Sequence, residues 1–123
     1  MKDEGMKSDI PDRTFQFAQR IVKLCLVMDE KPGVSRTLAN QLLRSGTSIG
    51  ANVEEGQASQ SKADFVSKYS IACKEARETH YWLRLLAACE VVPAPRLTEL
   101  EAECNELIAI LTTIIKKVRA RQS

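Results

Sequence analysis

The sequence predicts an all-α protein folded as an antiparallel up-down-up-down four-helix bundle. The first observation behind this prediction is that apolar residues recur in alternating steps of three and four along four long segments, the period of an amphipathic helix. The second is that short segments rich in proline, glycine or small polar residues separate them, at 29–35, 55–61 and 91–95. No segment alternates apolar and polar residues as a strand would. Long helices with short connections pack side by side in alternating directions.

The first predicted helix covers about 12–29. Residues 1–11 mix acidic and basic side chains without an apolar period, so we expect a flexible N-terminal segment there and a bundle that spans 12–121. The apolar face of this first helix consists of Phe17, Ile21, Leu24 and Met28.

The second predicted helix covers about 35–57, although it contains small residues in its middle. Each glycine costs a helix about 1 kcal/mol relative to alanine, yet the apolar period continues through Gly46 and Gly50. We interpret these small residues as positions where a neighbouring helix comes close. We expect Ser48 and Asn52 to be buried and hydrogen-bonded to a neighbouring helix, with Glu78 as a candidate partner.

The third predicted helix covers about 61–91 and has two apolar stripes, where a single bundle needs one. The second stripe mixes carboxylates with the only tryptophan of the chain, in the order Ile71, Glu75, Glu78, Trp82, Leu85. A wide core face and a subunit interface both explain this stripe. Because tryptophan is enriched in protein interfaces, we favour an oligomer interface that includes Ile71, Trp82 and Leu85.

The fourth predicted helix covers about 95–120 and has the most regular apolar seam. Its first half is acidic and its end, from Lys116 to Arg121, holds four cations and no acid. The seam consists of Leu97, Leu100, Cys104, Leu107, Leu111, Ile114 and Val118.

The net charge of +2 is too small to indicate a nucleic-acid partner by itself. The positions of the positive charges are therefore more informative than their sum. Cations at the end of the fourth helix suit the helix dipole, and those on the first two helices have few acids nearby in the sequence. Such cations either face solvent or follow phosphates. The candidate nucleic-acid contacts are Arg13, Arg20, Lys23, Arg36, Arg44, Lys116, Lys117, Arg119 and Arg121.

The sequence contains no constellation typical of catalysis, of a metal or of a cofactor. The stretch 46–50 lacks the lysine of a phosphate-binding loop. With His80 as the single histidine, the paired Glu-x-x-His motifs of a di-iron bundle are impossible. The four cysteines lack the close pairing of a zinc site, so we expect reduced, buried thiols. We expect no enzyme, no cofactor and no small-molecule substrate.

The chain shows no targeting or membrane-spanning segment. The N-terminal residues have no apolar region of a secretory signal, and no run approaches the roughly 18 apolar residues of a membrane span. We expect a cytoplasmic protein.

Three stretches resemble a known family. They are QLLRSGTSIGAN at 41–52, SKADFVSK at 61–68 and KEARETHYWLRLL at 74–86. Together they are similar to the bacterial four helix bundle proteins whose founding members are encoded by intervening sequences within 23S rRNA genes. The signature polar positions of that family match Ser48, Asn52, Glu55, Glu75 and Glu78, which we take as a structural polar layer. Relatives with the Tyr-Trp-Leu motif have arginine where this chain has Glu54, so the end of the second helix is more acidic here.

The resemblance implies a four-helix bundle that assembles as a homopentameric ring. A similar bundle is the accessory protein of diversity-generating retroelements, a basic pentamer that binds nucleic acid and reverse transcriptase. We therefore expect a non-enzymatic, homo-oligomeric binding or scaffolding module with structured RNA as its partner. The alternative is an adaptor that contacts only proteins.

Overall fold

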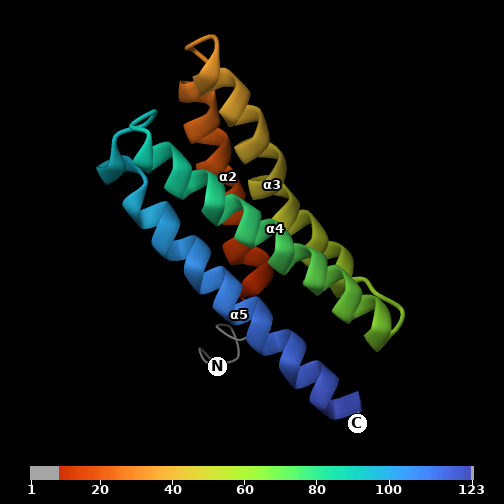
Figure 1. Cartoon of the computed structure of the whole chain (residues 1–123). Helices are drawn as coiled ribbons and strands as arrows, with labels where there is room; N and C mark the ends of the chain where they lie inside the picture. Colours follow the sequence, from red (N-terminus) through yellow and green to blue (C-terminus); the bar gives the residue numbers. More distant parts are fainter. Residues whose placement is uncertain (1–8, 123) are drawn as a thin grey trace.

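Four long helices account for most of residues 9–122, the part of the chain that the computed structural model describes (Figure 1). Helix α2 covers Ile10–Met28, α3 covers Val34–Gln57, α4 covers Lys62–Ala88 and α5 covers Thr98–Gln122. A short 3-10 turn, η1, covers Ala94–Arg96. Residues 1–8, where most of the predicted flexible segment falls, lie outside the described residues. Between residues 9 and 122 there is no strand.

The helices form the antiparallel four-helix bundle that the sequence predicts. Packing follows chain order, α2 on α3, α3 on α4 and α4 on α5, and a smaller set of contacts between α2 and α5 closes the bundle. Figure 1 shows successive helices running in opposite directions. The α2–α3 side of the bundle is therefore opposite the α4–α5 side. The predicted ring involves several chains and stays a prediction.

The helix ends differ from the predicted ends by a few residues, for local reasons. α2 starts before position 12, because Pro11 suits the first turn of a helix, so residues 10 and 11 are helical and not flexible. Ser61 caps α4 by accepting a hydrogen bond from the Asp64 backbone N–H at 3.1 Å. α4 stops before position 91, because Glu90 has a left-handed φ of 57°. α5 starts only after η1, later than position 95.

Glycines bring α2 and α4 close to α3, as the sequence analysis proposed. A Cβ atom on Gly46 would lie 2.8 Å from Cγ2 of Ile21 on α2. A Cβ on Gly50 would lie 3.3 Å from the backbone oxygen of Thr14, and Gly56 leaves similarly little room toward α4. The small residues therefore let these helices pack closer to α3 than a side chain would allow.

The buried polar contact between helices joins Ser45, a residue of the predicted seam, to Thr79, and it does not include Ser48 or Asn52. The Thr79 hydroxyl donates to Ser45 Oγ at 2.9 Å, and both side chains are fully buried between α3 and α4. Ser48 and Asn52 are half-buried, and each donates to a carbonyl of its own helix. The prediction that they bond to a neighbouring helix is wrong. A seven-residue seam drifts by about 20° per heptad on a straight helix, which turns Asn52, one heptad after Ser45, away from the core.

Three of the four cysteines are buried and free, as expected, and the fourth is not buried. Burial raises the pKa of Cys25 to about 11 and that of Cys104 to about 12, and Cys73 is also buried. Cys89 is exposed because it follows the last residue of α4, where the chain leaves the bundle. The expectation of four buried thiols is therefore wrong for Cys89.

Candidate nucleic-acid interface

The two predicted arginines of α2 are held by acids of α5, and no local pattern in the sequence indicates these pairs. Arg13 Nη2 lies 2.6 Å from Glu103 Oε1 and 2.8 Å from Glu106 Oε1. These two carboxylates, Glu103 first, raise the pKa of Arg13. Arg20 Nη2 lies 3.4 Å from Glu99 Oε1. The acidic first half of α5 thus neutralises α2, and the expectation that these arginines lack acidic neighbours is wrong.

The cations predicted on α3 are also paired. Arg36 Nε lies 3.2 Å from a carboxylate oxygen of Asp29, across the α2–α3 loop. Arg44 bridges two acids of α4, with Nη1 at 3.3 Å from Glu75 Oε1 and Nη2 bonded to Glu78. The expectation of few nearby acids is wrong here too, because residues far apart in sequence meet across the bundle.

The three predicted carboxylates lie where α3 meets α4, and their side chains range from 14% exposed for Glu75 to 58% for Glu55. Glu78 bonds to Arg44 and accepts a hydrogen bond from Trp82 Nε1 at 3.1 Å. These contacts, Arg44 first, lower the pKa of Glu78. Glu75 shares Arg44, and Glu55 is exposed and pairs with Lys68 at 2.8 Å. The acids therefore join α3 to α4 from outside the core.

A basic groove runs between α4 and α5, on the side of the bundle opposite α2 and α3. It has a volume of about 300 Å³ and includes Lys74 and Arg77 from α4 and Lys116 and Arg119 from α5. Its other lining residues are Ser70, Cys73, Thr112 and Ile115, so no acid lines it. Within residues 9–122, Lys74, Arg77 and Lys116 form no ion pair. We call these lining residues the α4–α5 groove.

Half of the cations in the groove were missed from the sequence. Lys74 and Arg77 lie about 40 residues before Lys116, and nothing in the sequence says that the two helix faces meet. One pattern in the sequence does point to the groove. Lys74 and Arg77 are three residues apart, as are Lys116 and Arg119, and this spacing places both cations of a pair on one face of their helix. Of the other predicted cations, Arg121 lies beyond the groove and Lys117 lines neither it nor a neighbouring pocket.

The remaining predicted cation, Lys23, lies at the other end of the bundle. It lines an open pocket with Arg20 and Arg96 and forms no ion pair with another described residue. It is therefore distant from the α4–α5 groove.

Most of the exposed large apolar residues lie on α2 and α3, and Tyr81, beside Trp82, is the one on α4 among the described residues. Ile71, Trp82 and Leu85 are each half-buried. By contrast, large apolar side chains of α2 and α3 are exposed: Phe15, Val22, Leu26, Val27, Val34 and Leu43. Three of these residues, Val22, Leu26 and Leu43, help to line an open groove of about 230 Å³ between α2 and α3.

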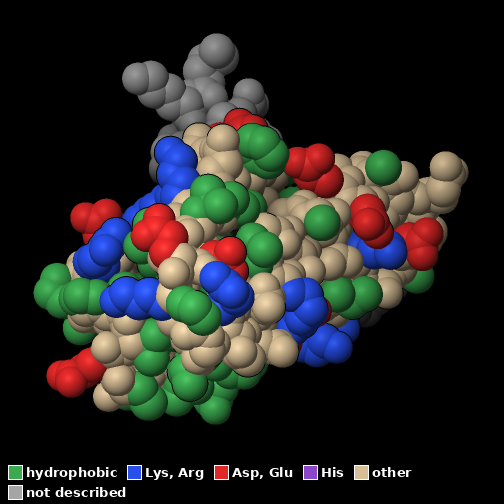
Figure 2. Space-filling view, turned by 90° about the horizontal axis from the view of Figure 1, so that it is seen from above, with side chains coloured by type: hydrophobic (Ala, Val, Ile, Leu, Met, Phe, Trp, Pro, Cys, Tyr) green, Lys and Arg blue, Asp and Glu red, His purple; other side chains and the backbone are tan. Residues whose placement is uncertain are grey.

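Charge is mixed over another face of the molecule. In Figure 2, which views the molecule from above, acidic and basic side chains alternate over the surface and hydrophobic side chains gather along the lower edge. A surface of mixed sign exerts little net attraction on a polyanion.

Residues 9–122 contain neither a candidate metal site nor a candidate membrane-spanning helix. Among these described residues, no group of three or more His, Cys, Asp or Glu side chains could hold a metal ion. In the same part of the chain, no helix combines the length and the apolar character that crossing a membrane requires.

Comparisons with known proteins agree with the resemblance seen in the sequence. The family model of the 23S rRNA-intervening sequence protein matches residues 6–113. A solved structure from Bacteroides thetaiotaomicron, a protein of unknown function from the S23 ribosomal protein family, is 40% identical, with a TM-score of 0.81. The match covers 87% of this chain and 98% of that one. No curated protein matches. The chain belongs to the 23S rRNA-intervening sequence protein family.

Proposed function

We propose that this protein is a non-enzymatic, cytoplasmic scaffold whose α4–α5 groove binds the phosphate backbone of structured RNA. The observation that carries the proposal is the concentration of cations in one groove without an acid in its lining. Four arginines outside the groove, Arg13, Arg20, Arg36 and Arg44, are instead paired with carboxylates.

The groove is suited to phosphates for a physical reason. A cation that is already in an ion pair loses that contact when it binds a phosphate. Arg77 and Lys116 have no such contact to lose, and Lys74 has only a longer-range attraction to Glu78. Neutralising phosphates releases counterions from the nucleic acid, which is the main driving force of binding without base specificity. Binding at this groove is therefore expected to be salt-dependent and tolerant of sequence.

Assembly into a homo-oligomeric ring, of five chains by the family resemblance, would strengthen this binding. Each groove alone offers few contacts, but a ring repeats the groove around one axis. Linked weak sites on a single RNA can raise avidity by roughly 10²–10⁴. Light scattering coupled to size exclusion tests the ring: the mass should be a multiple of 13.7 kDa, and a monomer at micromolar concentration would contradict assembly.

The binding experiment compares two variants that each lose three positive charges. In the groove variant, Lys74, Arg77 and Lys116 become glutamine. In the control variant, the exposed cations Lys23, Lys31 and Arg96 at the other end of the bundle become glutamine. Titrations with a structured RNA at low and high salt should show weaker binding for the groove variant than for the control.

Each outcome of these titrations is informative. Equal affinity of the two variants would move the site away from the α4–α5 groove. A further variant, with Lys116, Lys117, Arg119 and Arg121 changed to glutamine, tests the end of α5 alone. Absence of binding by the wild type at low salt would reject the nucleic-acid function.

The second candidate function is a protein adaptor, which the exposed apolar residues of α2 and α3 favour. Phe15 and Leu26 are 57% and 65% exposed, and clustered exposed apolar side chains are typical of protein-binding surfaces. Changing Phe15 to serine and, separately, Trp82 to serine distinguishes the two surfaces. Whichever substitution lowers the mass in light scattering identifies the surface that contacts another copy.

A further inference from the structure

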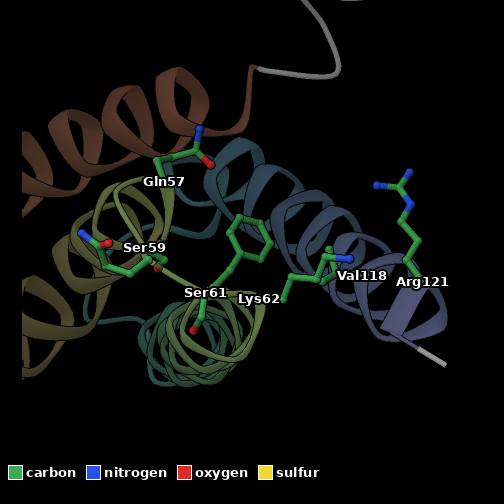
Figure 3. Close-up of a pocket in the computed structure, with 9 residues that line it drawn as sticks. Gln57, Ser59, Ser61, Lys62, Val118 and Arg121 are labelled. Carbon is green, nitrogen blue, oxygen red and sulfur yellow. The ribbon is translucent and has the colours of Figure 1, made fainter.

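A pocket with an aromatic lining lies where the turn between α3 and α4 meets the end of α5. It is open, with a volume of about 390 Å³, and none of the described residues that line it is an acid. Figure 3 shows Ser59 and Ser61 along the turn, Gln57 on one side, and Arg121 extending from the last turn of α5. The residues that line it include Gln57, Lys62, Phe65, Val118 and Arg121. We call this site the turn pocket.

The aromatic ring of the pocket is held in place from below. Phe65 is half-buried and stacks on Tyr69, with ring centroids 4.1 Å apart and an angle of 24° between the planes. Tyr69 is buried against Gly56, where a Cβ would come within 2.7 Å of its ring. A base that stacks on Phe65 would therefore meet a fixed ring. Stacking on aromatic side chains is how proteins commonly hold unpaired bases.

The pocket also offers hydrogen-bond donors of fixed direction. Burial raises the pKa of Tyr69 to about 12, so its hydroxyl stays protonated and donates to Gln57 Oε1 at 2.8 Å. With its oxygen engaged, Gln57 has its NH₂ group left as a donor at the rim of the pocket, where Figure 3 shows it pointing outward, and such a donor suits the ring nitrogens and carbonyl oxygens at base edges.

The turn pocket adjoins the α4–α5 groove. Val118 lines the pocket, and the next residue, Arg119, lines the groove. Lys62 in the pocket precedes Lys74 in the groove by twelve residues of α4, a separation of about 18 Å. This separation spans several nucleotide steps of a paired RNA stem. Lys62 and Arg121 form no ion pair with a described residue, so they can contact the backbone beside a base.

From this geometry we propose that the turn pocket holds one unpaired base of the RNA whose paired stem lies along the α4–α5 groove. The proposal rests on the RNA-binding function proposed above and adds its substrate class: RNA with an unpaired nucleotide beside a stem of several base pairs. A base inside a duplex has both faces stacked and cannot use the ring of Phe65.

The test uses two RNA hairpins that differ in a single base. Both carry a one-nucleotide bulge flanked by at least five base pairs on each side. In one the bulged nucleotide is adenosine, and in the other it is an abasic residue with the same phosphates. The wild type should bind the adenosine hairpin about five- to 150-fold more tightly, the range that stacking of one base on an aromatic ring corresponds to.

Two variants locate the effect. Phe65→Leu keeps an apolar side chain but removes the ring, so the preference for the adenosine hairpin should disappear while affinity for the abasic hairpin is unchanged. Phe15→Leu, on the opposite side of the bundle, should keep the preference. Thermal unfolding checks that Phe65→Leu is folded. If it is not, Gln57→Ala, an exposed position, should reduce the preference by several-fold without affecting the abasic hairpin.

The outcomes separate this proposal from the function on which it rests. Equal, salt-dependent binding of both hairpins by the wild type would overturn the pocket and leave the RNA-binding groove. A preference that survives in both Phe65→Leu and Gln57→Ala would also overturn it. Binding of neither hairpin would reject the RNA-binding function itself. Adenosine monophosphate that binds as tightly as the adenosine hairpin would assign the pocket to a free nucleotide instead.

Discussion

Replacing Gly46 with alanine tests how closely α2 approaches α3. The new Cβ would lie 2.8 Å from Cγ2 and 3.0 Å from Cγ1 of Ile21, which is fully buried. Carbon atoms in contact are normally about 3.5–4.0 Å apart. The Ile21 Cβ itself would be 3.3 Å away, so rotating the isoleucine side chain cannot remove the overlap. Either α2 moves or the core is strained.

The expected free-energy change combines two opposing effects. Alanine favours the helix by about 1 kcal/mol over glycine, whereas an extra methyl group in a packed core costs about 1–3 kcal/mol. The net expectation for Gly46→Ala is a loss of about 0–2 kcal/mol in the free energy of unfolding. Ala51→Gly, at an exposed position of the same helix, measures the helix effect alone.

Urea denaturation of the variants provides the assay. In an Ile21→Ala background, Cγ2 and Cγ1 are gone, only the Cβ contact at 3.3 Å remains, and the methyl group that Gly46→Ala adds fills part of the resulting cavity. Gly46→Ala should therefore stabilise that background by up to about 1 kcal/mol, which reverses its sign. A gain of the full 1 kcal/mol or so in the wild-type background would refute the close approach of α2 to α3.

Three other predictions follow from single contacts. Thr79→Val should lower the free energy of unfolding by about 1–3 kcal/mol because the buried Ser45 hydroxyl loses the Thr79 hydroxyl and keeps only a long contact of 3.4 Å to the Leu42 carbonyl. In the double variant with Ser45→Ala the loss should be clearly smaller than the sum of the single losses; additive losses in denaturant titrations would contradict the pair. The lowered pKa of Glu78 stabilises the fold above its unfolded-state value of about 4.3, and this contribution is lost as pH falls through the folded-state pKa. The stability difference between wild type and Glu78→Gln should thus be present at pH 7 and be lost as the pH falls below the folded-state pKa of Glu78; a difference independent of pH would argue against the ion pair. A thiol reagent at pH 8 should react quickly with the exposed Cys89 and slowly with Cys104, whose pKa burial raises to about 12; a fast phase that persists in Cys89→Ser would contradict this.

The fold could be predicted from the sequence because a bundle is encoded by local periodicity. The seam from Leu97 to Leu111 requires only that apolar residues recur once per helical turn, and those residues are buried in the core. The role of the glycines of α3 could be predicted for the same reason. The apolar helical period continues through Gly46, which indicates that this glycine lies within a helix and makes room for a neighbouring one.

The candidate site could be predicted only in part because it depends on which helix faces meet. Arg13 and Glu103 are 90 residues apart, and no local pattern reveals that they pair. The same holds for the α4–α5 groove, where Lys116 was identified from a run of cations and Lys74 was not. Prediction of Asn52 as a buried residue failed because a strict heptad pattern ignores the drift of a straight helix.

The dependence of RNA affinity on salt tests the central claim most directly. Each cation that contacts a phosphate contributes about 0.7–0.9 to the slope of log affinity against log salt concentration. For every chain that contacts the RNA, the variant with Lys74, Arg77 and Lys116 changed to glutamine should show a slope smaller by roughly 2–3 than the wild type. The control variant at Lys23, Lys31 and Arg96 should keep the wild-type slope. An unchanged slope in the groove variant would contradict the assignment of the α4–α5 groove as the RNA-binding surface.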